Sequence, residues 1–447
     1  MTNSDGSLSR EFTTLAMTQT RSPRSPLNKN QRRGFLAAWG GLTLDGMDSF
    51  IYALVLVPAL RVLLPRSGTP ATPGAIGYYG GLLFAVFLVG WGFSFIWGPI
   101  GDRIGRVPTL ALTIACYSLF TFLGAVATNV WMLGAFRLLA GVGIGGEWTL
   151  GSTFIAEELP EDRRVMAAGI NNSGYYVGLF LAAAANYALG PRFGWRAVFA
   201  VGGAPILLAV FVRYGVSETK RWSRRVEEIG HARPLGRPLL ELFSADYRVR
   251  TWLNMAYLQV SIIGLWAGSV YAPTAVVQLA ARAGLSASEG SRLASWGATV
   301  LAIGSILGCL LAPVLAEWLG RRAALGSYFS LMIISILGAF GKAFYLREHA
   351  LFWFIASLFF LGLGGGSFGV YTLWLPEQYH TECRATAFGF ITSVGRFGGA
   401  AVTSLVGLGV AHFQTLGIPV ALTATAFALG LVLVPFGVET KGKPLPR

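Results

Sequence analysis

The sequence predicts an all-α membrane protein with twelve transmembrane helices in two six-helix halves. Apolar residues make up 54% of the 447 residues and charged residues only 13%, too little charge to keep a soluble chain of this length hydrated. The apolar residues come in runs long enough to cross about 30 Å of hydrocarbon as helices. These runs do not alternate as barrel strands do, and only helices and closed barrels satisfy their backbone groups in lipid.

The longest polar stretch, 215–250, lies between the sixth and seventh apolar runs. We therefore expect an N-terminal half at 34–214, a central loop at 215–250 and a C-terminal half at 251–436. Residues 1–33 are expected to form a disordered tail without a signal peptide, and 437–447 a short second tail. The spans are expected near 34–62, 75–97, 108–128, 131–157, 165–190, 196–214, 251–280, 292–316, 323–345, 350–375, 385–411 and 416–436.

The formal net charge of +14 is distributed unevenly among the loops. Most Lys and Arg lie in the tails, the central loop and every second loop, whereas the alternate loops carry few. This asymmetry is the positive-inside pattern, so both termini are expected to be cytoplasmic, in a bacterial inner membrane. The excess of basic residues thus reflects the membrane topology, and we expect no nucleic-acid partner.

Two loop motifs recur in register between the halves. Asp102 and Arg106 close the loop after the second span, and Glu317 and Arg321 close the loop after the eighth with the same spacing. After the fourth span Glu157 precedes Arg164 by seven residues, and after the tenth Glu377 precedes Arg384 by seven. Two six-span repeats are an architecture of transporters that rock around a central site. The expected gating residues are Asp102, Arg103, Arg106, Glu157, Arg164, Glu317, Arg321, Glu377 and Arg384.

The loop Gly98–Arg106 resembles the signature loop of the major facilitator superfamily. Arg137 followed by Gly141–Glu147 is similar to the fourth-helix motif of that family. The resemblance implies the major facilitator fold, alternating access, and a latch in which Asp102 holds a neighbouring helix end. The second-half loop carries Glu317 in place of the aspartate, which departs from that pattern.

Ionisable residues inside spans cost roughly 2.5–3.5 kcal/mol each on insertion scales and are functional candidates. Asp45 and Asp48 share one helix face, and Asp45 lies about 15 Å deep by the helical rise. Arg396 lies about 18 Å deep. A desolvated carboxyl suits a coupling proton, and an arginine suits a substrate carboxylate. We therefore expect proton coupling at Asp45, Asp48 and Glu147, and substrate binding at Arg396 and Arg137; buried structural ion pairs are the alternative.

The segment Leu44–Ser49 is similar to the first-helix motif of proton-coupled organic-acid carriers in this superfamily, which transport aromatic acids, sialate or monocarboxylates. The resemblance implies roles for Asp45, Asp48, Arg137 and Glu157. Residues 49–54 depart from the aromatic-acid pattern towards the sialate and monocarboxylate form, so the substrate stays open. Further substrate-binding candidates are Asn171, Asn172, Tyr175, Tyr176, Asn254, Tyr257, Gln259, Trp266, Tyr371 and Trp374, with ordinary interhelical packing as the alternative.

The preferred interpretation is a proton-coupled symporter of a small organic anion, acting as a monomer in the lipid bilayer. A sugar or polyol symporter is the nearest alternative, because 216–222 and 438–442 resemble sugar-porter landmarks. A drug or metabolite exporter and a non-transporting membrane sensor also remain open. No nucleophile and base occur in a catalytic pattern, so we expect no enzyme. The three cysteines and four histidines lack metal-site spacing, and we expect no cofactor.

Overall fold

The computed structural model describes residues 25–229, 236–413 and 415–446, and these residues form helices and connecting turns without a strand. The first half contains α2 (Lys29–Arg66), α3 (Pro73–Phe93), η1 (Ser94–Ile96), α4 (Trp97–Ile104), α5 (Arg106–Gly124), α6 (Val130–Glu158), α7 (Glu161–Val201) and α8 (Ile206–Gly215). The central segment contains α9 (Lys220–Ile229) and α10 (Arg237–Glu241). The second half contains α11 (Arg248–Arg282), α12 (Ala287–Leu319), α13 (Arg321–Ile336), η2 (Leu337–Lys342), η3 (Ala343–Tyr345), α14 (Ala350–Gly365), α15 (Ser367–Trp374), η4 (Pro376–Gln378), α16 (Arg384–Phe413), α17 (Gly417–Leu422), α18 (Ala424–Leu433) and η5 (Val434–Phe436).

These helices make the expected twelve spans. Several spans combine consecutive elements, such as α3 with η1 and α4, whereas α7 enters two spans because Gly194 adopts φ +76° and breaks the helix. Among the described residues, eight helical segments are long and apolar enough to cross a membrane by composition alone. A ninth candidate, α2, is bent by 66° between Leu56 and Pro58.

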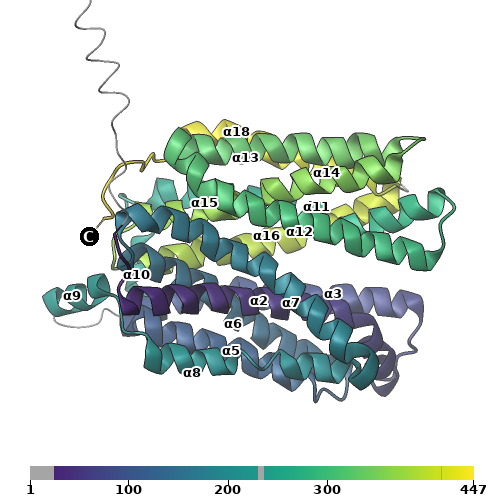
Figure 1. Ribbon diagram of the computed structural model, residues 1–447, viewed down its shortest axis with the longest axis horizontal. Helices are drawn as coiled ribbons and strands as arrows, with labels where there is room; N and C mark the ends of the chain where they lie inside the picture. Colours follow the sequence, from purple (N-terminus) through teal and green to yellow (C-terminus); the bar gives the residue numbers. More distant parts are fainter. Residues whose placement is uncertain (1–24, 230–235, 414, 447) are drawn as a thin grey trace, which may run out of the picture.

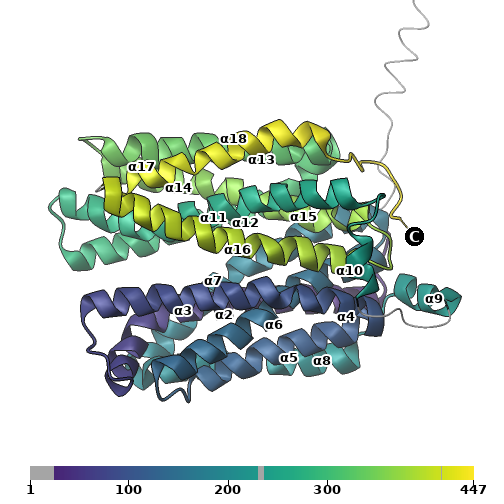
Figure 2. The same cartoon turned by 180° about the vertical axis from the view of Figure 1, so that it is seen from behind.

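The two halves lie side by side as two layers of roughly parallel helices (Figures 1 and 2). Each half has buried apolar clusters made mainly of its own residues, and α7 packs on α12 and α15 while α16 packs on α3 and α4. Large apolar side chains such as Leu207, Trp318 and Leu429 are exposed, at 73%, 78% and 66%. Exposed apolar residues in these numbers would aggregate in water, and they fit a surface that lipid covers.

The start of α2, α9, α10 and the C-terminal segment all lie at one end of the molecule, which we call the terminal end (Figures 1 and 2). The expected disordered tail of residues 1–33 is wrong for its last part, because α2 already begins at Lys29. Asn28 and Gln31 form a capping box there, which satisfies backbone N–H groups at the helix start. Most of that expected tail, residues 1–24, lies outside the described residues.

Candidate functional site

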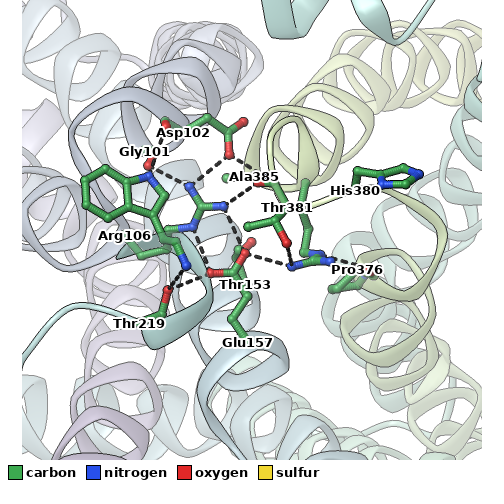
Figure 3. A network of polar contacts seen from close by, with 12 residues as sticks. Gly101, Asp102, Arg106, Thr153, Glu157, Thr219, Pro376, His380, Thr381 and Ala385 are labelled. Carbon is green, nitrogen blue, oxygen red and sulfur yellow. Dashed lines mark hydrogen bonds and ion pairs between the residues drawn. The ribbon is translucent and has the colours of Figure 1, made fainter. Parts of the chain in front are cut away.

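A buried ion-pair network lies at the terminal end of the first half. Arg106 donates to both carboxylate oxygens of Glu157, from Nε at 3.1 Å and from NH2 at 2.9 Å. Its NH1 also lies 3.0 Å from Asp102, and NH2 donates to the carbonyl of Thr381 in the second half (Figure 3). Thr219 donates to Glu157 at 2.8 Å. Because every one of these donors finds an acceptor, the buried charges are compensated.

Asp102 links this network to the other half of the molecule. Its Oδ2 accepts from the backbone N–H of Thr386 at 2.8 Å and from the Thr386 hydroxyl at 2.5 Å, and its Oδ1 accepts from the N–H of Ala385 at 3.4 Å. These N–H groups belong to the first turn of α16, so the carboxylate caps that helix and meets the positive end of its dipole. The loop motif of one half thereby holds a helix of the other.

The second half repeats the ion-pair network. Arg321 donates to both oxygens of Glu377 at 3.0 Å, and Thr440 donates to Glu377 at 2.5 Å, as Thr219 does to Glu157. The latch is not repeated. Glu317 pairs with Arg321 in its own half at 3.1 Å and its side chain is 57% exposed, so it caps no helix of the first half among the described residues.

Two arginines cross between the halves. Arg384 donates from NH1 to Glu157 at 2.8 Å, and Arg164 reaches Glu377 at 3.5 Å. The shorter pair is fully buried on both sides. All but two of the expected gating residues belong to two networks, each with a contact that crosses between the halves: Asp102, Arg106, Glu157 and Arg384 in the first, and Arg164, Arg321 and Glu377 in the second. Arg103 is exposed, and Glu317 stays within its own half.

Both loops turn at a glycine that an adjacent glutamate covers. Gly105 has φ +108° and Gly320 has φ +92°, a region that favours glycine. Glu218 accepts from the N–H of Val107 after the first turn, and Glu439 accepts from the N–H groups of Arg321 and Arg322 after the second.

The pKa values of the two glutamates are shifted in opposite directions. Burial raises the pKa of Glu218 above its usual value, despite its backbone hydrogen bonds. Burial also opposes the ionisation of Glu439, but backbone N–H groups, first that of Arg321, outweigh it and hold its pKa below the usual value. Both residues therefore help to shape the loops. From the sequence, the only indication was the resemblance of the segments that contain them, 216–222 and 438–442, to sugar-porter landmarks.

In the middle of the membrane, Asp48 and Arg137 form a buried ion pair. Arg137 NH1 lies 3.3 Å from Asp48 Oδ1, which also accepts from Thr121 at 2.6 Å. The guanidinium lies over the rings of Tyr52 and Phe87, with 4.8 and 4.2 Å between its carbon and the ring centroids. This pair joins α2 to α6 within the first half, although Oδ2 of Asp48 and both Nε and NH2 of Arg137 are buried without a hydrogen-bond partner among the described residues.

Asp45 and Glu147 differ from Asp48, whose Oδ1 accepts from both Thr121 and Arg137. Asp45 and Glu147 are 0% and 1% exposed, and neither carboxylate has a hydrogen-bond partner among the described residues. The Nε of Arg396 is likewise buried without a partner. Arg396 lies within electrostatic range of Asp45, and Glu147 lies against Gly41, one helical turn from Asp45 along α2. A buried polar group without a partner is costly, so Asp45, Glu147 and Arg396 are candidates for binding a proton or a ligand.

The guanidinium of Arg396 packs against aromatic side chains of the first half. Its carbon lies 3.7 Å from the centroid of the Trp91 ring, and Tyr175 lies 6.4 Å from Trp91 between ring centroids. A Cβ at Gly145 of α6 would overlap Ser94 and the Trp91 ring, so this glycine lets α3 and its indole approach α6 closely. Trp91, which the sequence did not single out, is therefore fixed by the glycine-rich fourth-span motif.

The remaining polar candidates fall into two groups. Asn171 is 1% exposed with no partner for its amide, and Asn172 bonds across the halves to Cys309 at 3.3 Å and to Thr372 at 3.4 Å. Tyr175 and Tyr176 lie within electrostatic range of Arg396. Asn172, Tyr175 and Tyr176 therefore lie at the interface between the halves, near the unpaired charges.

Most second-half candidates instead stabilise their own half. Tyr257 donates to the carbonyl of Leu433, Tyr371 to that of Tyr257, Trp374 to that of Val438, and Asn254 to Gln378. Gln259 differs, because its amide nitrogen is buried without a partner and lies against Gly398, two residues from Arg396. The side chain of Trp266 lies outside the described residues.

Comparisons with known proteins agree with this architecture. The family model described as Major Facilitator Superfamily matches residues 38–403. The chain belongs to the major facilitator superfamily. It is accordingly a multi-pass membrane transporter.

Two relatives cover nearly the whole chain. The niacin transporter NiaP of Acinetobacter baylyi is 27% identical over 91% of this chain and 93% of its own. A probable 4-methylmuconolactone transporter of Cupriavidus pinatubonensis is 30% identical over 92% and 91%. A solved structure of the proton:xylose symporter XylE with a bound bromodeoxyglucose superposes with a TM-score of 0.73 at 20% identity, covering 93% of this chain and 98% of that one. At that identity, the likeness to XylE shows the fold alone.

Proposed function

We propose that this transporter carries a small organic anion with a carboxylate group together with a proton, by alternating access between the two halves. The observation that carries the proposal is the juxtaposition of Arg396 of the second half and Asp45 of the first, both buried and incompletely bonded. The names of the two relatives, a niacin and a methylmuconolactone transporter, support a ring-bearing organic acid or its close derivative.

The charges suggest how substrate and proton are coupled. A substrate carboxylate that approaches the free Nε of Arg396 brings a second anion close to Asp45. Two carboxylates beside one guanidinium repel each other in a low dielectric, and protonation of Asp45 removes the repulsion. Substrate and proton therefore favour each other's binding. Asp48 is the weaker candidate for the carrier because Arg137 already neutralises it.

Glu147 extends this proton site towards the terminal end. It is fully buried and unpaired, and it lies beside Gly41, on the side of Asp45 that leads back to the start of α2. We assign it to receive the proton from Asp45 when the terminal end opens. Because basic residues concentrate in the loops and tails of that end, we place the terminal end and both chain termini in the cytoplasm of a bacterial cell.

Uptake into proteoliposomes under an imposed pH gradient tests the proposal. The labelled panel contains nicotinate, muconate, a short monocarboxylate, sialate and a hexose. We expect uptake of at least one carboxylate that collapses with a protonophore. Uptake of the hexose without any carboxylate would replace the proposal with a sugar symporter.

Two variants assign the roles. Arg396→Gln is expected to abolish uptake and exchange alike, because the substrate loses its cation. Asp45→Asn is expected to retain exchange of labelled for unlabelled substrate but to lose uphill uptake. Glu289→Gln, at an exposed helix start far in sequence from both, is the matched control. If Arg396→Gln transports at the wild-type rate, the substrate assignment is wrong.

A further inference from the structure

We propose that residues 442–446, which follow the last span and which we call the strap, hold the terminal end closed. After η5 the chain passes Thr440, whose hydroxyl donates to Glu377 of the second-half network. The N–H of Lys443 then donates to the carbonyl of Thr440 at 3.0 Å, which turns the chain towards the junction of the two halves. This inference concerns the gate and does not depend on the substrate.

The strap contacts two arginines on different sides of that junction. Arg384, at the start of α16, donates from NH2 to the carbonyl of Pro446 at 2.6 Å. Arg221 of α9, which continues from the first half, donates from NH1 to the carbonyl of Leu445 at 3.5 Å. Since Arg384 also holds Glu157 of the first half, the strap completes the coordination of the residue that ties the halves together.

The burial pattern of the strap fits a docked segment. Lys443 and Pro444 are exposed, whereas Leu445 is only 3% exposed and serves as the apolar anchor. Arg384 is fully buried, so each of its N–H groups needs an acceptor. The positive charges of Arg106 and Arg221 repel that of Arg384. The strap supplies the neutral carbonyl oxygen of Pro446, which accepts a hydrogen bond from Arg384 without adding another charge to this buried site.

Helix α9 reinforces the same closure from the other side. Trp222 donates to the carbonyl of Asp102 at 3.0 Å, and Arg225 forms an ion pair with Glu382 just before α16. Opening of the terminal end must separate Glu157 from Arg384, and the strap then has to leave Arg221, Arg384 or both. Release of the strap is therefore part of the opening step, and its loss shifts the equilibrium towards the open terminal end.

Two variants disrupt or remove the strap, a third is a milder substitute, and a fourth leaves the strap intact. Leu445→Asp places a charge at the buried anchor, and a chain truncated after Lys443 lacks both carbonyl acceptors. Leu445→Ala is a milder substitute where Leu445→Asp does not fold. Lys443→Ala changes an exposed strap residue whose side chain makes no hydrogen bond that we describe, and it is the control.

The three native cysteines report on opening. Cys309 lies between the halves against Asn172, Cys383 lies beside Arg384, and Cys116 lies partly exposed on α5, away from the interface. Alkylation of each by a membrane-impermeant maleimide is followed by mass spectrometry in inside-out vesicles. The use of these vesicles rests on the proposed cytoplasmic placement, which protease cleavage within α9 in the same vesicles checks separately.

We expect strap removal to raise the alkylation rates of Cys309 and Cys383 severalfold relative to Cys116, with no change in Lys443→Ala. Cys309 decides the outcome, because it is deep between the halves and is reached only when the terminal end opens. A rise at Cys383 alone means that the strap merely covers the surface, and the proposal is then wrong. Unchanged rates at both cysteines, or the same rise in Lys443→Ala, overturn it as well.

Discussion

The guanidinium of Arg396 lies 3.7 Å above the ring of Trp91, although the two residues belong to different halves of the molecule. Trp91 is 4% exposed, so this cation–π contact is desolvated and is worth about 2 kcal/mol. The ring covers one face of the guanidinium, whose Nε is buried without a hydrogen-bond partner among the described residues. Trp91 thus orients the cation that we assign to the substrate.

We expect Trp91→Ala to raise the KM for the transported carboxylate by roughly 10- to 30-fold, the equivalent of about 1.4–2 kcal/mol. Trp91→Phe keeps a ring over the guanidinium and should raise it much less. The measurement is initial-rate uptake at fixed pH, with size-exclusion chromatography to confirm folding. Equal KM values for Trp91→Ala and the wild type would mean that the stack plays no part in binding.

Asp45 and Asp48 should differ in their effect on stability. Asp48→Asn leaves Arg137 charged and buried without its partner, which typically costs 3–5 kcal/mol. Asp45 accepts no hydrogen bond among the described residues and interacts with Arg396 only at longer range, so Asp45→Asn should lower the thermal midpoint much less than Asp48→Asn does. Thermal unfolding in detergent, followed by tryptophan fluorescence, measures both.

The double variant Asp48→Asn/Arg137→Gln removes both charges and is expected to recover much of the stability that Asp48→Asn loses. Recovery would show that the loss came from an uncompensated buried charge. If Asp45→Asn is as unstable as Asp48→Asn, the distinction between the two aspartates is wrong.

The one-sided latch predicts unequal effects of the two repeat loops. Asp102→Asn weakens a cap that crosses between the halves, and such caps contribute roughly 0.5–2 kcal/mol. Glu317→Gln removes only an exposed pair within one half, worth little. Alkylation of Cys309 from the terminal end should therefore increase several-fold in Asp102→Asn and stay unchanged in Glu317→Gln. Equal effects of the two changes would argue for a symmetric latch.

The sequence indicated the twelve spans and singled out the paired loop charges, because repetition is visible in a single chain; the gating role of these charges stays a prediction. Asp102, Glu157 and Arg384 stood out by their spacing, and the structure places all three in the interhalf network. The repeat suggested a gating role for Glu317 that its contacts do not support, because among the described residues Glu317 pairs only within its own half. Identical spacing in the sequence does not show whether a carboxylate reaches across the interface.

The central site was only partly predictable. Sequence reasoning found both first-helix aspartates but could not separate them, because Arg137 and Thr121, the partners of Asp48, come from other helices. Trp91 is one of many aromatic residues in an apolar chain, and its contact with Arg396 depends on how the halves meet. The strap could not be predicted from the sequence either, because it acts through backbone carbonyl groups, which every residue has.

Glu218 and Glu439 occupy matching positions in the two halves and should respond to pH in opposite directions. Glu439 has a lowered pKa, so its charged form is the one that the fold stabilises, chiefly through N–H groups at the start of α13. Its contribution to stability is fully present above the unfolded value of about 4.3 and is lost as the pH falls through the lower folded value.

Glu218 has a raised pKa because of burial, so ionisation costs stability. Its contribution is greatest below about 4.3 and declines as the pH rises through the higher folded value. The measurement is the thermal midpoint of unfolding from pH 3.5 to 7. The midpoint of each variant, Glu439→Gln or Glu218→Gln, is subtracted from that of the wild type, which gives one difference curve per variant. The Glu439 difference should shrink towards the acid end, whereas the Glu218 difference should shrink towards neutrality. Two difference curves with the same slope would contradict the assignment, because one repeat position would then be charged in the same way in both halves.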